Sequence, residues 1–314
     1  MFDVSRETLH KILAKKQKTV QIAIAFKKQI CYNKMEYIGC LSCGSTLLRL
    51  TAEFLLKGTV NMGKIIAFAN QKGGVGKTTS CVNIAASLGI LGYKVLIIDL
   101  DPQGNTTSGV GISKKGLKAT TKELLTGSMP IREIIQQTPY ENLWVIPTNT
   151  ALAGAEFDLF DFDESEFRIK KGLEEISADF DYILIDCPPS LGMLTINAFA
   201  ASDGVIVPMQ CEFYALEGLS QLMITINRIK RMYNPDLSIT GILITMYNGR
   251  LLLSMQVISE LSQHYADKLF DTKISRNVKL TEAPGFGKPA YYHDKSSKGA
   301  KEYIEVAKEL ITRI

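Results

Sequence analysis

The sequence predicts an α/β fold, a mostly parallel sheet flanked by helices on both faces. Short apolar runs recur along the chain, and most are followed by a segment with helical spacing. Residues 70–80, between the first run and its helix, read Asn-Gln-Lys-Gly-Gly-Val-Gly-Lys-Thr-Thr-Ser, which is typical of a phosphate-binding loop. Two further runs deliver Asp99 and Asp186 at their ends, where open α/β sheets place functional groups.

Composition indicates an ordinary globular protein. The chain has 314 residues, of which 46% are hydrophobic and 22% are charged, enough for one large domain and an appendage. No apolar run is long enough to span a bilayer, and we find no secretory signal pattern. The six cysteines are therefore interpreted as reduced thiols.

The charge divides the chain into a basic extension, residues 1–61, and a main domain, residues 62–314. The extension carries ten Lys/Arg and four Asp/Glu, a net charge of +6, whereas the main domain carries 26 and 28, a net charge of −2. Nucleic-acid binding by the main domain would therefore need a local basic patch.

The extension is poorly defined by its sequence. Cys40 and Cys43 have the spacing of a zinc knuckle, but a second matching pair is absent, so metal binding and a weakly ordered extension both stay open. Met62 stands immediately before the first predicted strand, where an initiator would stand. A further alternative is therefore that residues 1–61 are not part of the native protein.

Residues 64–69 are predicted to form the first strand, and the helix after the loop includes residues 81–91. Gly73, Gly74 and Gly76 permit positive φ, so backbone N–H groups can surround a phosphate. Lys77 would reach the β- and γ-phosphates, and the Thr78 hydroxyl would ligate Mg²⁺. The predicted nucleotide-binding loop residues are Lys72, Gly73, Gly74, Val75, Gly76, Lys77, Thr78 and Thr79.

The remaining elements follow in α/β order. Residues 94–100 form the second predicted strand, which leads into Asp99 and Asp101, and residues 180–186 form the fourth, with Asp186 placed to hold a water on Mg²⁺. Residues 111–137 are interpreted as a surface excursion. The other predicted strands are 142–147, 204–208 and 238–246, and the other predicted helices are 151–162, 166–176, 191–201, a long one ending near 232, 254–265 and 303–314.

The glycine loop departs from the common pattern, because Gln71 replaces its first glycine and a second lysine, Lys72, stands at its start. This form resembles the deviant Walker A motif of the ParA/MinD group, and residues 62–314 most resemble the ParA/Soj family of partition ATPases. The resemblance implies a P-loop ATPase that needs ATP and Mg²⁺ and is weakly active alone. It also implies a homodimer in the ATP state, in which Lys72 reaches the partner's nucleotide.

The resemblance assigns roles to further residues. Asp101 helps to activate the attacking water, so Lys72 and Asp101 are the predicted catalytic residues. Asp99 supports Mg²⁺ and the loop, which makes Thr78, Asp99 and Asp186 the predicted metal residues. Asn248 is expected near the nucleotide base.

The same family binds DNA without sequence preference, and a ParB-type partner stimulates hydrolysis and release. The segment Ile274–Pro284 resembles the family's Pro-Arg-Asn-Val-[Arg/Lys]-Leu segment, with Ser275 in place of proline. The alternative is that the basic residues named below are ordinary solvated charges. The resemblance also implies a cytoplasmic, nucleoid-associated protein. We expect Arg276→Ala to lower affinity for all DNA sequences and to leave ATP binding intact. The predicted DNA-binding residues are Arg250, Arg276, Lys279, Lys295 and Lys298.

Two other functions share this scaffold. A MinD-type division regulator cycles on membranes through a basic C-terminal helix, but here Glu302, Glu305 and Glu309 lie among the lysines of residues 301–314. That mixed charge gives weak attraction to an anionic bilayer, so no stable membrane association is expected. The third alternative is an ATP-dependent ligase, for which we find no second substrate constellation.

Overall fold

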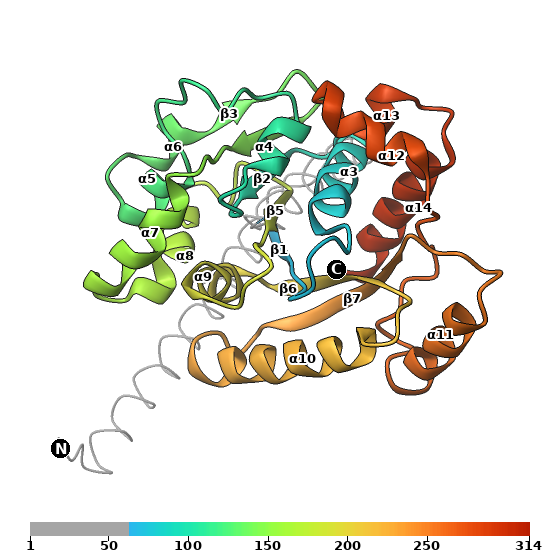
Figure 1. The fold of residues 1–314 in the computed structure, drawn as a ribbon. Helices are drawn as coiled ribbons and strands as arrows, with labels where there is room; N and C mark the ends of the chain where they lie inside the picture. Colours follow the sequence, from blue (N-terminus) through green and yellow to red (C-terminus); the bar gives the residue numbers. More distant parts are fainter. Residues whose placement is uncertain (1–62) are drawn as a thin grey trace, which may run out of the picture. The chain divides into compact units, whose positions relative to one another are not determined.

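The computed structural model describes residues 63–314, so the extension 1–61 with its cysteines lies outside the described residues. A seven-stranded sheet has the order β3-β4-β2-β5-β1-β6-β7 (Figure 1). Its neighbouring strands are parallel except β3, which pairs antiparallel with β4. The strands are β1 (Lys64–Phe68), β2 (Val95–Asp99), β3 (Gln136–Gln137), β4 (Leu143–Ile146), β5 (Tyr182–Asp186), β6 (Gly204–Gln210) and β7 (Ser238–Thr245).

Helices connect the strands and cover both faces of the sheet, as predicted. The helices are α3 (Lys77–Ile90), α4 (Asn105–Gly109), α5 (Thr121–Thr126), α6 (Ile131–Ile134), α7 (Leu152–Asp158), α8 (Arg168–Leu173), α9 (Met193–Ala201), α10 (Ala215–Met232), α11 (Leu252–His264), α12 (Val278–Glu282), α13 (Ala290–His293) and α14 (Lys298–Arg313), with 3-10 turns η1 (Leu159–Asp161), η2 (Ser165–Phe167) and η3 (Ala283–Phe286). None of these helices is both long and apolar enough to cross a membrane.

Each face of the sheet carries its own hydrophobic core, because successive strand side chains point to opposite faces. In β1, Ile66 and Phe68 pack with α3 and α14, whereas Ala67 packs with α9 and α10 on the other side. Figure 1 shows α3 and α14 side by side on one face and α10 across the other. Buried on both faces, the central strands are continuous apolar runs.

The strand register aligns the functional ends of three strands. β5 lies between β1 and β2, and Asp186 pairs with Phe68 on one side and with Asp99 on the other. The two aspartates therefore lie side by side at the carboxyl edge, next to the loop that leaves β1.

Several predicted boundaries were wrong. The excursion 111–137, in whose sequence we find short helical patches, contains α5 and α6 and also the short antiparallel strand β3, which was not predicted. The last helix begins at Lys298, not at 303, because the Ser297 hydroxyl accepts a hydrogen bond from Ala300 N at 3.3 Å and caps it. β6 continues past Pro208, which is tolerated because β1 pairs with β6 only as far as Ile206.

Candidate functional site

The loop between β1 and α3 has the conformation that its glycines predict. Gly74 and Gly76 adopt φ of 72° and 87°, in the region that favours glycine. Around Gly73 and Gly74, no heavy atom lies within 4 Å of the position that a Cβ would take. A ligand can therefore approach the loop backbone closely.

Side chains from the neighbouring strands hold this loop by its carbonyl groups. Gln210 Nε2 donates to Gly74 O at 2.8 Å, and Thr245 Oγ1 donates to Val75 O at 2.7 Å. Within residues 63–314, the backbone N–H groups of Gly74, Val75 and Gly76 donate to no acceptor. The loop with the start of α3, residues 73–79, thus forms an anion cradle, as we call it below.

A buried lysine lies at this cradle. Lys77 is the first residue of α3, is buried, and donates from Nζ to Lys72 O at 3.2 Å. Burial lowers the pKa of Lys77, while the nearby Asp186, Cys187 and Asp101 act in the opposite direction. A phosphate here would repay the desolvation of the ammonium group and favour its charged form.

The second lysine of the loop, Lys72, is held differently. Its ammonium group forms an ion pair with Glu212, which follows β6, and both side chains are exposed. Its backbone N–H donates to Asn70 Oδ1 at 3.0 Å. The Lys72 side chain is thus at the surface of the described chain and free to move at low cost.

Asp186 offers the clearest place for a metal ion. It is fully buried, and its Oδ2 accepts hydrogen bonds from the hydroxyls of Thr78 and Thr106, both at 2.7 Å. Its Oδ1 is buried with no partner among the described residues. Burial raises the pKa of Asp186 to about 6. A buried carboxylate oxygen without a donor fits Mg²⁺ or a water on Mg²⁺, with Thr78 beside it.

Asp99 is also buried, but its oxygens already have donors. Oδ2 accepts from Thr107 N at 2.7 Å and Thr107 Oγ1 at 2.6 Å, and Oδ1 accepts from Asp101 N at 3.3 Å. Burial and the charge of Asp186 raise the pKa of Asp99 to about 8. These contacts fit a bracing role for Asp99 in the turn that carries Asp101, more than direct ligation.

Asp101 lies just beyond the end of β2 and is partly exposed. Its Oδ1 accepts from Gln103 N at 2.9 Å, so the carboxylate is oriented by its own turn. Its charge raises the pKa of both Lys77 and Asp186, and its access to solvent suits the orientation of a water molecule.

Cys187, directly after Asp186, is a core residue. It is buried, and burial raises the pKa of its thiol well above the ordinary range. In residues 63–314, no group of three or more His, Cys, Asp or Glu is arranged to hold a metal ion. A magnesium site at Asp186 would therefore take its other ligands from Thr78, water and phosphate oxygens.

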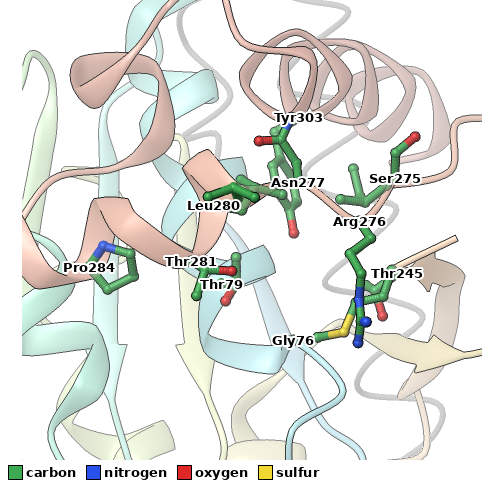
Figure 2. Close-up of a pocket in the computed structure, with 13 residues that line it drawn as sticks. Gly76, Thr79, Thr245, Ser275, Arg276, Asn277, Leu280, Thr281, Pro284 and Tyr303 are labelled. Atoms are coloured by element: carbon green, nitrogen blue, oxygen red, sulfur yellow. The ribbon is translucent and has the colours of Figure 1, made fainter.

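A pocket of about 550 Å³ opens beside the cradle. Its walls come from the loop and α3, from the segment 274–284 and from Tyr303 of α14. Figure 2 shows the Arg276 side chain extended toward Thr245 and Gly76. Leu280 and Pro284 supply apolar surface, and Asn277 supplies polar groups. Apolar walls with few polar groups suit a nucleoside.

This pocket bears on two of the predictions. Arg276 and Lys279 of segment 274–284 are predicted DNA-binding residues, and Arg276 also lines the pocket that adjoins the cradle. Asn248, predicted to lie near the base, lines a separate pocket of about 430 Å³ with Gln210 and Glu212, and its Oδ1 accepts from Arg250 N at 3.1 Å. Arg276 lines both pockets.

The predicted DNA-binding residues fall into two groups. Arg250, Arg276 and Lys295 are exposed, and none of them has an ion-pair partner in the described part of the chain. Lys279 and Lys298 are paired instead, with Glu282 at 2.9 Å and with Glu302 at 3.6 Å.

Some site residues had no recognised role in the sequence. Thr106 could have been found, because it stands seven residues after Asp99 in a run of hydroxyl residues. Glu212 and Tyr303 gave no such signal, since each reaches the site from a distant part of the chain. Tyr303 shares a hydrogen bond of 3.1 Å with Ser80 of α3.

Comparison with known proteins identifies the family. A family model described as an AAA domain matches residues 63–239. The chain is 51% identical to the sporulation initiation inhibitor protein Soj of Bacillus subtilis over 249 residues, which cover 79% of this chain and 98% of that protein. It is 46% identical to the chromosome partitioning protein ParA of Myxococcus xanthus, covering 82% and 91%.

The chain belongs to the ParA/Soj family of ATPases. Among solved structures, one described as cobyrinic acid a,c-diamide synthase from Mycobacterium smegmatis with bound ADP and magnesium has a TM-score of 0.70 and 36% identity, covering 80% of this chain and 94% of that one. A Borrelia burgdorferi putative plasmid partition protein bound to AMPPNP has a TM-score of 0.65 and 30% identity, covering 80% and 98%. The predicted P-loop fold is confirmed. In these neighbours the fold binds ADP with magnesium and AMPPNP, respectively.

Proposed function

We propose that this ParA/Soj family member is an ATP-dependent dimerising switch for DNA partitioning. The observation that carries the proposal is the anion cradle beside Asp186, whose buried Oδ1 lacks a partner among the described residues. Next to it, Lys72 is paired with Glu212 at the surface, while Lys77 alone occupies the cradle. The site thus has one lysine for its own nucleotide and a second one that is available to another subunit.

The chain's own residues divide the work of hydrolysis. The loop N–H groups and Lys77 bind the phosphates, and Asp101 orients the attacking water. Thr78 and Asp186 would hold Mg²⁺, which neutralises phosphate charge when bound. Asp99 fixes the turn that positions Asp101. Hydrolysis is slow until the site is complete.

Completion comes from a second subunit. Lys72 leaves Glu212 and contacts the triphosphate of its partner, where a cation stabilises charge on the transferring phosphoryl group. Because the Lys72–Glu212 pair is exposed, its rupture costs little. Nucleotide state and dimer state thereby depend on each other.

The ATP-bound dimer binds DNA through its unpaired cations. Arg250, Arg276 and Lys295 contact phosphates, which gives affinity that is independent of sequence and falls steeply with salt. Lys279 and Lys298 contribute less, because Glu282 and Glu302 neutralise them. A ParB-type protein stimulates hydrolysis and so releases the dimer from DNA in the nucleoid. Support for partitioning comes from the named Soj and ParA relatives.

Lys72→Ala tests the switch. We expect the parent protein to dimerise with ATP and Mg²⁺ in sedimentation velocity, and the variant to bind ATP but stay monomeric with phosphate release near background. The control is Lys115→Ala, which removes another exposed lysine. If Lys72→Ala keeps ATP-driven dimerisation and turnover, the proposed switch is wrong.

DNA co-sedimentation with ATP, ADP or no nucleotide, at two salt concentrations, tests the DNA step. We expect DNA binding only with ATP, and weaker binding at high salt. DNA binding of equal strength with ATP, with ADP and without nucleotide would contradict the proposal.

Flotation with anionic vesicles and ATP addresses the membrane-cycling alternative. We expect the protein to stay in the unbound fraction.

A second candidate is cobyrinic acid a,c-diamide synthesis, favoured by the likeness to the M. smegmatis structure of that description at 36% identity. ATP hydrolysis is measured with cobyrinic acid and glutamine, and separately with DNA. Turnover that rises with cobyrinic acid and forms the diamide would support the second candidate.

A further inference from the structure

A helical ridge outside the nucleotide site exposes aromatic side chains. The ridge comprises residues 151–167, which include α7, η1 and η2. Leu152, Ala155 and Leu159 are buried in the core. On the opposite side, Phe157 and Phe160 are 77% and 71% exposed. The two rings are three residues apart on a continuous helical stretch, so they are neighbours on its outer face.

The ridge is also strongly acidic. Residues 151–167 carry six carboxylates and no Lys or Arg, although residues 62–314 as a whole carry only −2. Asp158 pairs with Lys122 at 3.6 Å, and Glu164 pairs with Lys171. The other four carboxylates have no ion-pair partner among the described residues: Glu156, Asp161, Asp163 and Glu166.

This combination defines the chemistry of an occupant. Exposed phenylalanines next to each other offer apolar area that a partner can bury. The carboxylates repel DNA and anionic membranes and attract lysine and arginine. One ring already accepts such a group, because the Arg168 guanidinium lies over Phe162 at 5.0 Å from the ring centre. The described domain of a second copy is a poorer occupant, since residues 62–314 carry a net charge of −2.

We propose that the ridge docks a cationic amphipathic segment of a partner protein. Apolar side chains of that segment cover Phe157 and Phe160, and its basic side chains face Asp161 and Asp163. The proposal does not depend on the nucleotide switch.

The ridge is connected to the nucleotide site by its own contacts. Thr107 Oγ1, which donates to Asp99, accepts from Thr148 N at 2.9 Å, just before α7 begins. The Glu156 carboxylate occupies the space that a side chain at Gly192 would need, in the segment that follows β5. A bound segment would therefore lie at the carboxyl edge of the sheet, the edge that carries the cradle (Figure 1).

Fluorescence anisotropy with the full chain tests the docking surface. The probe is a labelled amphipathic helix of leucine and lysine, about 18 residues long. The first variant is Phe157→Ala/Phe160→Ala, and the second is Asp161→Asn/Asp163→Asn. The matched control is Phe213→Ala/Tyr214→Ala, which removes two similarly exposed rings elsewhere. All six positions are exposed, so the variants are expected to keep the fold, which circular dichroism checks.

We expect the phenylalanine variant to weaken peptide binding about tenfold and the control by less than about twofold. The asparagine variant should bind several-fold more weakly and depend less on salt. Equal binding by the parent and the phenylalanine variant, or an equal loss in the control, would overturn the proposal. So would equal binding of a leucine–glutamate peptide, or a change in self-association or vesicle binding without a change in peptide binding.

Discussion

The carboxylates at the strand ends and the basic side chains at the surface are both needed for the proposed switch, but the fold treats them in opposite ways. Asp99 and Asp186 are fully buried and receive hydrogen bonds from three threonine hydroxyls and two backbone N–H groups. Arg250 and Lys295 are exposed, and no side-chain partner holds them in the described part of the chain.

The difference follows from what each group must contact. Groups that act on a phosphoryl transfer must be fixed before the substrate arrives, because reorganisation during the reaction is costly. Groups that contact a flexible polyanion need only supply charge, and mobility lets them match many phosphate positions. Substitutions of the buried carboxylates Asp99 and Asp186 should therefore abolish hydrolysis. Substitutions of the exposed basic side chains should weaken DNA binding gradually.

The largest effect is expected for Asp186→Asn. The amide keeps the size of the side chain but cannot supply the charge of the carboxylate to Mg²⁺, so Mg²⁺-dependent phosphate release should fall at least about 100-fold. The matched control is Asp236→Asn, at an exposed position, which should retain parental turnover. If Asp186→Asn kept turnover within a few-fold of the parent, the Asp186 carboxylate would not be required for hydrolysis.

Arg276 belongs to both regions, because it is exposed and also lines the pocket beside the cradle. For Arg276→Ala we expect DNA affinity to fall about tenfold for all sequences. The sequence alone predicted intact ATP binding, but the place of Arg276 in the pocket leads us to expect ATP affinity to fall as well. Arg250→Ala is the control, since Arg250 does not line that pocket, and should lower DNA affinity alone. Labelled-ATP titration and DNA co-sedimentation separate the two outcomes. Unchanged ATP affinity in Arg276→Ala would show that Arg276 acts only as a surface cation, like Arg250 and Lys295.

The two buried carboxylates, Asp99 and Asp186, also predict a pH dependence of stability. Because the pKa of Asp99 is raised to about 8 from its ordinary 3.8, the folded protein holds this proton more tightly than the unfolded chain does. Without Mg²⁺ and nucleotide, stability should therefore fall as pH rises from about 4 to about 8. Melting temperatures should show a shallower decline for Asp99→Asn, and parallel declines in the two proteins would contradict the burial effect.

The smallest effects are expected for Lys279→Ala and Lys298→Ala. Their charges are already balanced by Glu282 and Glu302, so DNA affinity should change by less than about twofold. Lys295→Ala is the unpaired control in the same region and should cost more. An equal loss of DNA affinity in all three lysine variants would show that ion pairing does not determine which lysines contribute to DNA binding.

Local sequence predicted the part of the site that is continuous in the chain. Residues 72–79 and Asp186 could be identified because a phosphate loop requires glycines and a lysine at fixed spacing, and a buried strand that ends in aspartate is distinctive. The pairing of Lys72 with Glu212 depends on how β6 lies beside β1, and the wall formed by Tyr303 depends on how α14 packs on α3. Those contacts arise from tertiary packing, which periodicity within one segment does not encode.

The boundary errors have a similar cause. Ser297 begins α14 as a cap, but a serine between polar residues is common in loops and was not recognised. The apolar side that Leu280 and Pro284 give segment 274–284 was not recognised either, because the resemblance pointed to its basic residues. Charge is visible in a sequence, whereas the direction in which a side chain faces is not.

The last helix of the chain has a practical consequence. Tyr303 of α14 is buried, lines the pocket beside the cradle and shares a hydrogen bond with Ser80 of α3, so this helix would contribute to the proposed nucleotide site. Deleting the final turns should impair nucleotide affinity as well as stability. A fluorescent reporter attached after Ile314 would then register ligand binding, and it would need checking for interference before being used to follow the protein in cells.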